Sequence, residues 1–245
     1  MNLLTIAAIL VSATTPGQNT ERATCLTTAY PGVICDFKDN QVVWCDGTPM
    51  PWDDGKQKPH QALLNAPDLE DQFTYRYTIA HPPGENQDPG RIRYAPFFAK
   101  LYGDSRPQVR RALKRVRWLP ARGRKSVRIH SRAAEPLAAV AVELAALPRR
   151  FKKYLRKPPQ TFVWRHVRGT KRLSAHSYGI ALDLAIPFAD YWRWRGVHRY
   201  RNRIPMEIVR IFEKHGFIWG GRWYHFDTMH FEYRPELLVE PCREP

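Results

Sequence analysis

Two short stretches of the sequence hold side chains that are suited to metal chemistry. The first contains His176 and Asp183, and the second, further along the chain, contains Asp227 and His230. Two histidines and one aspartate are a common ligand set for a catalytic zinc ion and leave its fourth position for water. A further carboxylate is needed to take the proton of that water and pass it to a leaving amine. These residues therefore indicate a zinc hydrolase in which Asp227 is the base.

Both stretches alternate as β-strands do, which predicts strands over residues 180–186 and 228–233. Asp183 shares a face with small alanines, and a buried aspartate is rare unless it is paired or bound to a metal. Asp227 precedes the second strand, so a bend is needed to bring its carboxylate to the face of His230. The alternative is that the histidines are hydrogen-bonded structural residues and that Asp183 is a turn or cap residue.

The two stretches are parts of longer motifs that occur in a fixed order: Ser174-x-His176-x-x-Gly179-x-Ala181-x-Asp183, then Trp219-Gly220-Gly221-x-Trp223 and Asp227-x-x-His230-Phe231-Glu232. With these motifs, residues 126–238 resemble the VanY-type D-alanyl-D-alanine carboxypeptidases. That family includes peptidoglycan L-alanyl-D-glutamate endopeptidases and shares a zinc fold with lysostaphin-type endopeptidases and the hedgehog signalling domain. The resemblance implies zinc-dependent hydrolysis of a peptide bond in peptidoglycan stem peptides.

The resemblance also implies a role for single residues. It makes His176, Asp183 and His230 the ligands of Zn²⁺ and Asp227 the catalytic base. The arginine that the family carries before the first motif, which would stabilise an oxyanion, falls best on Arg165, with two neighbouring alternatives, Arg168 and Arg172.

Three further residues flank these positions. By the same resemblance, Ser174 holds the loop that bears His176, and Trp223 lines the substrate groove. His225 stands two residues before the base and either assists it or is a plain exposed histidine. Many carboxypeptidases of the family have Glu at the position of Asp227, whereas Asp is more like the endopeptidase branch, so the scissile bond stays open between D-Ala-D-Ala and L-Ala-D-Glu.

The composition adds a strong positive charge of +16 with a pI near 10.0. Basic residues gather in 106–132, 149–172 and 193–203, and such a surface attracts nucleic acid, acidic membrane or anionic wall polymer. No zinc-finger spacing, ribonucleoprotein motif or recognition-helix pattern supports an obligatory nucleic-acid partner. Two alternatives to the peptidase remain, a non-catalytic zinc-containing wall-binding module and a basic nucleic-acid-binding protein. The module is disfavoured because binding alone does not require a base such as Asp227.

Residues 3–13 are apolar and end in the small-residue site Val11-Ser12-Ala13, which predicts a secretory leader over residues 1–20 although no Lys or Arg precedes it. The segment is too short for a membrane span, and the alternative is a buried strand or helix. We therefore expect an exported protein of the periplasm or cell envelope, without a transmembrane span.

Four cysteines permit two disulfides in any of three pairings. A β-hairpin with a three-residue turn around Asp39 would place Cys35 opposite Cys45, close enough to bridge. That pairing would leave Cys25 and Cys242 to tie the two ends of the chain together.

The remaining patterns predict an α+β fold, with a small, mostly antiparallel sheet flanked by helices and an irregular N-terminal wrapping region. A helix is expected over 134–147, and because it is apolar nearly all round we expect it to be buried; a second helix is expected over 204–214. Further strands are expected over 126–130, 161–167 and 217–219. A chain of 245 residues can bury a sizeable core. We expect a leader over 1–20, an accessory region over 21–120 and a zinc peptidase domain over 121–245, acting as a monomer.

Overall fold

The computed structural model describes residues 16–78, 83–195 and 199–243. The apolar part of the expected leader, residues 3–13, lies outside this range, and the first helix, α1, spans Pro16–Ala29. Among the described helices, none combines the length and apolar character that a bilayer crossing requires.

The N-terminal region contains a three-stranded antiparallel sheet of β1 (Ile34–Lys38), β2 (Gln41–Trp44) and β3 (Pro49–Pro51). The turn between β1 and β2 has two residues, Asp39 and Asn40, both with positive φ, and not the three expected. The register shifts between Ile34 and Asp36, which leaves Cys35 as an extra residue of β1, and the predicted Cys35–Cys45 disulfide is confirmed. The second predicted disulfide, Cys25–Cys242, is also confirmed and joins α1 to the C-terminal segment.

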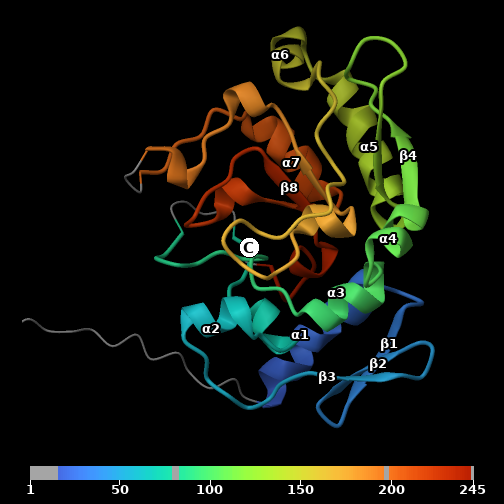
Figure 1. Cartoon of the computed structure of the whole chain (residues 1–245), viewed down its shortest axis with the longest axis vertical. Helices are drawn as coiled ribbons and strands as arrows, with labels where there is room; N and C mark the ends of the chain where they lie inside the picture. Colours follow the sequence, from blue (N-terminus) through green and yellow to red (C-terminus); the bar gives the residue numbers. More distant parts are fainter. Residues whose placement is uncertain (1–15, 79–82, 196–198, 244–245) are drawn as a thin grey trace, which may run out of the picture.

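The rest of the fold confirms the α+β prediction (Figure 1). One antiparallel sheet has the order β6-β8-β7, and a separate hairpin joins β4 to β5. The strands are β4 (Leu113–Arg117), β5 (Ser126–His130), β6 (Ala181–Asp183), β7 (Phe217–Trp219) and β8 (His230–Tyr233). The helices are α2 (His60–Asn65), α3 (Ala95–Tyr102), α4 (Arg106–Ala112), α5 (Ser131–Ala146), α6 (Lys152–Leu155) and α7 (Met206–Lys214).

The β6-β8-β7 sheet separates two hydrophobic cores because side chains alternate across its strands. Leu182 and Phe231 point to one side and pack with residues of α5, α7 and the β4–β5 hairpin. Ala181 and Ile218 point to the other side and pack with the N-terminal region. We call this second side, which also carries Asp183, His230 and Glu232, the site face. Residues 23–102 therefore contribute to the core on the site face of the strands that bear the two motifs.

Three predicted strands differ from the structure. The strand predicted over 228–233 begins only at His230, because Thr228 and Met229 form a turn. Residues 161–167 form no strand: they run extended, with isolated bridges at either end (Gln160–Asp183 and His166–Leu173), and Val163 donates a hydrogen bond to the carbonyl of His176. The strand predicted over 180–186 ends early because Ala185 adopts the left-handed conformation, with φ 53°, and a 3₁₀ turn (Ile186–Phe188) follows it.

Helix α5 begins at Ser131, three residues before the predicted start, because the ring of His130 accepts a hydrogen bond from the backbone N–H of Arg132. Only one of its faces is buried, and Val142 on the opposite face is 57% exposed. The prediction of a helix that is apolar and buried nearly all round was therefore wrong.

The buried ring of His130 predicts an acid-sensitive fold. Burial, followed by the neighbouring Arg132, lowers the pKa of His130 from 6.5 to about 4. Between these values the unfolded chain binds a proton that the folded chain does not, so the free energy of unfolding falls as the pH drops from 6.5 to 4, by roughly 3 kcal/mol at most. Urea unfolding at pH 7 and pH 4.5 should show a smaller loss for His130→Asn than for the parent. The exposed-residue control His166→Asn should lose as much as the parent; an equal loss in all three proteins would contradict this role.

Candidate metal centre

The structure brings His176, Asp183 and His230 into one cluster. Asp183 and His230 are direct cross-strand partners in β6 and β8, and Oδ1 of Asp183 lies 3.3 Å from Nδ1 of His230. The same oxygen lies 3.2 Å from Nε2 of His176, which belongs to a 3₁₀ turn, η3 (Ala175–Tyr178). Two strands and one turn thus direct three potential ligand atoms to a common point.

Local structure fixes the position of His176. The hydroxyl of Ser174 accepts a hydrogen bond from the backbone N–H of His176 and caps η3, as expected for Ser174. Gly179 ends the turn in the left-handed conformation, with φ 68°, and a Cβ there would lie 2.7 Å from a methyl group of Leu113. Only glycine meets both conditions without strain.

The hydrogen bonds of the two histidines leave the nitrogens that face Asp183 available for a metal. Nδ1 of His176 lies 2.7 Å from the carbonyl oxygen of Thr161, which places the ring proton on Nδ1. Its Nε2 is buried and has no hydrogen-bond partner among the described residues. Nε2 of His230 lies 3.3 Å from Glu232, so its Nδ1 faces Asp183. Histidine ligands of zinc are usually held in this way by a carbonyl or carboxylate, so the residues fit a zinc ion.

The charges around this cluster favour a cation. Burial alone would raise the pKa of Asp183, yet the two adjacent histidines lower it well below its usual range. Burial disfavours a charged ring at His230, but Asp183 and Glu232 raise its pKa to about 10. Because a metal must displace the proton that these two carboxylates stabilise, metal binding is expected to weaken as the pH falls.

Glu232 lies directly behind His230 and is completely buried. Burial would raise its pKa, but Arg93, at 3.3 Å, His230 and Arg234 lower it to about 2. An ionised carboxylate here orients the ring of His230 and accepts its N–H. Neither arginine partner was foreseen from the sequence.

Asp227 reaches the site through a turn that precedes β8. Its carbonyl accepts a hydrogen bond from the backbone N–H of His230, and this turn supplies the expected bend. Burial raises the pKa of the Asp227 carboxyl to about 6, although His230 opposes the shift. Its Oδ1 is buried and has no hydrogen-bond partner within the described ranges. A buried carboxylate with a raised pKa is suited to accept and return a proton.

The arginines are placed differently from the sequence-based expectation. The side chains of Arg165 and Arg168 are exposed, whereas Arg172 is half-buried and donates a hydrogen bond to the carbonyl of Arg91. Burial, with Arg93 and Arg91 nearby, lowers the pKa of Arg172 to about 10. Arg91 and Arg93 come from an irregular segment that offers no pattern in the sequence, so only the fold reveals them.

A segment of the N-terminal region, residues 87–91, is hydrogen-bonded to residues 223–225, just before Asp227. We call this set of contacts the clamp. The indole N–H of Trp223 donates to the carbonyl of Pro89 at 2.6 Å, and Tyr224 N–H donates to Gln87. Trp223 is only 5% exposed and its ring lies 5.4 Å from that of His230, so it packs behind this histidine more than it lines an open groove.

His225 belongs to a second histidine–aspartate group, with His60 and Asp88. One oxygen of Asp88 accepts from the backbone N–H of His225, and the other lies 2.7 Å from its Nδ1 and 3.1 Å from a guanidinium nitrogen of Arg91. Both carboxylate oxygens are therefore already engaged, one of them by a cation. We interpret this group as part of the clamp and not as a second metal site.

The contrast between the two groups predicts selective effects on metal content. The protein purified with zinc should hold about one zinc per chain, measured by elemental mass spectrometry after gel filtration. His176→Ala and His230→Ala should each lose it, while the matched control His225→Ala should keep it. Loss of zinc in His225→Ala with retention in His230→Ala would reverse the assignment.

Comparison with known proteins agrees with this geometry over part of the chain. A family model described as D-alanyl-D-alanine carboxypeptidase matches residues 168–233, a span that includes His176, Asp183, Asp227 and His230. No curated protein and no solved structure matches the chain. The segment that carries the candidate metal centre is thus similar to a carboxypeptidase family.

Proposed function

We propose that this protein is a zinc-dependent peptidase that hydrolyses a bond in peptidoglycan stem peptides, as VanY-type enzymes do. The observation that carries the proposal is the convergence of His176, Asp183 and His230, with the buried carboxylate of Asp227 beside them. The family match over residues 168–233 supports it. Action on the cell wall requires export, so the proposal includes an extracytoplasmic location.

Each residue of the site would have a separate role in hydrolysis. His176, Asp183 and His230 would hold the ion, and a bound zinc supplies a Lewis acid that polarises the scissile carbonyl. Asp227 would take a proton from the attacking water and return it to the leaving amine. This role agrees with its burial and with a pKa near 6, at which a carboxylate both accepts and releases protons.

The arginine group would receive the negative charge of the substrate. The Nε of Arg172 is buried and has no hydrogen-bond partner among the residues described, and Arg91 stacks over Trp223 at 5.8 Å. A carboxylate of the stem peptide or a developing oxyanion would satisfy these donors. We therefore assign the cationic role to Arg172 and Arg91 in place of the exposed Arg165.

Hydrolysis of purified muropeptides, followed by mass spectrometry, tests the proposal and identifies the scissile bond. The zinc-loaded protein should release either D-alanine or the L-alanyl-linked glycan fragment, and a chelator should abolish the release. Asp227→Asn should lower kcat by at least about 100-fold, since general-base catalysis contributes that much, while zinc content stays the same. Full activity in Asp227→Asn or His230→Ala would contradict the proposal.

The clamp predicts a second effect on the same reaction. Asp88→Asn removes the charge that holds His225 and Arg91, so we expect Asp227 to be less well positioned and kcat to fall about 10-fold to 100-fold. Zinc content should change little. Asp54→Asn, which removes a carboxylate at the surface, is the matched control and should behave as the parent does.

A further inference from the structure

Most of the excess positive charge of this chain lies in one part of the sequence. Residues 105–182 contain 21 Lys and Arg and only two acidic residues, Glu135 and Glu143. Their net charge is therefore +19. The other residues therefore carry a net charge of −3 within the total of +16. A polyanion would be drawn to this part of the molecule and not to the protein as a whole.

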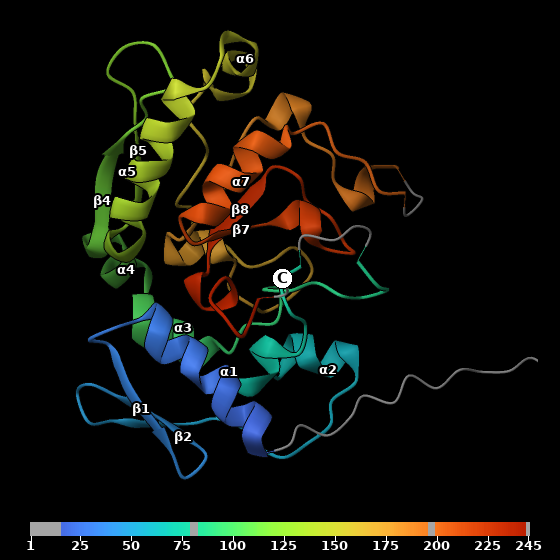
Figure 2. The ribbon, with the colours of Figure 1, turned by 180° about the vertical axis from the view of Figure 1, so that it is seen from behind.

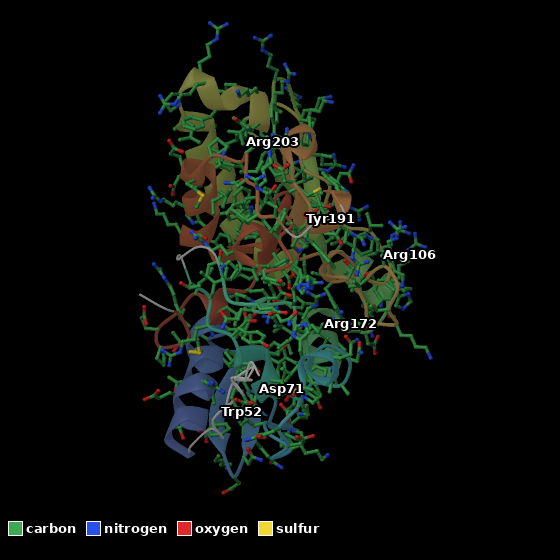
Figure 3. All side chains as sticks on the ribbon, turned by 90° about the vertical axis from the view of Figure 1, so that its left-hand side faces the viewer. Trp52, Asp71, Arg106, Arg172, Tyr191 and Arg203 are labelled. Carbon is green, nitrogen blue, oxygen red and sulfur yellow. A yellow bond between two sulfur atoms is a disulfide. The ribbon has the colours of Figure 1, made fainter. Side chains whose placement is uncertain are left out.

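Ten of these basic residues lie on α4 and the β4–β5 hairpin, which together we call the hairpin surface. Figures 1 and 2 show β4 at the outer edge of the molecule, with α5 between it and the rest of the fold, and Figure 3 shows Arg106 at the margin. All ten side chains are exposed, and none of them forms an ion pair with another described residue. They are Arg106, Arg110, Arg111, Lys114, Arg115, Arg117, Arg122, Arg124, Lys125 and Arg128.

The hairpin places like charges against one another. Arg115 and Arg128 are direct cross-strand partners, and Arg117 follows on the same outward face. The alternate residues Val116 and Val127 are buried in the core that α5 covers. Like charges that face each other across a sheet are destabilising, and the described residues provide no acid to offset them. An anion that bridges the arginines would remove this repulsion.

The composition of the surface indicates which anion it fits. Eight of the ten residues are arginines, whose planar fork pairs with the oxygens of a phosphate. The one Phe, Tyr or Trp between residues 105 and 132 is Trp118, and it is fully buried. The surface therefore offers no ring on which a nucleic-acid base could stack. These features favour a phosphodiester chain without bases.

We propose that the hairpin surface binds a linear, base-free phosphodiester polymer of the cell envelope and so holds the protein on the wall. The placement of the polymer in the envelope rests on the proposed function, whereas binding does not require hydrolysis. The base of the hairpin contacts the loop that carries His176: His130 N–H donates to the carbonyl of Gly179 at 2.7 Å, and Leu113 packs on this glycine. A polymer held there would keep the metal centre close to wall peptides.

The test measures retention on immobilised poly(glycerol phosphate) as a function of salt. The parent should bind at low salt, with an affinity that falls steeply as salt rises. A triple variant of the outward face should bind on the order of 100-fold more weakly, since each arginine near an anionic surface contributes about fivefold. Its changes are Arg115→Gln, Arg117→Gln and Arg128→Gln. The matched control removes three exposed charges elsewhere and should bind within about threefold of the parent: Lys38→Gln, Arg76→Gln and Arg210→Gln.

The outcomes separate this proposal from the peptidase function. Both triple variants should hydrolyse a soluble stem peptide at the parental rate, and absence of hydrolysis in all proteins would contradict only the proposed function. Unchanged polymer binding in the hairpin variant, or equal weakening of binding in the control, would overturn the proposal that the polymer binds at the hairpin surface. Tighter binding of the parent to double-stranded DNA at equal phosphate concentration would make nucleic acid the partner and would also overturn it. If the triple variant does not fold, the single changes Arg117→Gln and Arg128→Gln should each weaken binding about fivefold.

Discussion

The side chain of Glu232 is completely buried behind His230, and it keeps its charge because two arginines reach it from different parts of the chain. A buried ion without a partner costs several kcal/mol, so the two arginines stabilise the charged form of Glu232. Arg234 follows directly after β8 and is itself paired with Glu236. Arg93 comes from the N-terminal region. The orientation of His230 therefore depends on a segment that lies far outside the motif of which His230 is part.

This dependence explains why the N-terminal region packs as closely as it does. A three-stranded sheet is too small to shield both of its faces, and α5 and α7 cover only one. The N-terminal region covers the site face, and at Gly90 the backbone approaches so closely that a Cβ would lie 2.3 Å from Ile218. With φ at 94°, this position also requires glycine for conformational reasons. The irregular segment around Gly90 is thus part of the wall of the site. The Cys25–Cys242 disulfide joins α1, at the beginning of the N-terminal region, to the C-terminal segment.

The parts of the site that follow from local periodicity could be predicted from the sequence. Alternation placed His230 and Glu232 on one face of a strand, and β8 has them there. Alternation failed at residues 161–167 because a strand also needs a partner along its length, and this segment bonds to η3 instead. The left-handed Ala185 has no local signal, since alanine does not favour that conformation. Arg91 and Arg93 could not be assigned because only tertiary packing brings them to the site.

The two histidine–aspartate groups show that residue types alone do not identify a metal site. Around His176 and His230, a backbone carbonyl and a buried carboxylate accept from the outer ring nitrogens, so that the inner nitrogens face Asp183, where a metal would displace the remaining proton. At His60, burial is the largest cause of a lowered ring pKa, and the positive charge of two nearby arginines lowers it further, in spite of Asp88. A metal ion entering there would meet a guanidinium 3.1 Å from its carboxylate ligand. The same set of side chains is therefore suited to hold a cation where acids surround it, and forms a clamp where arginines do.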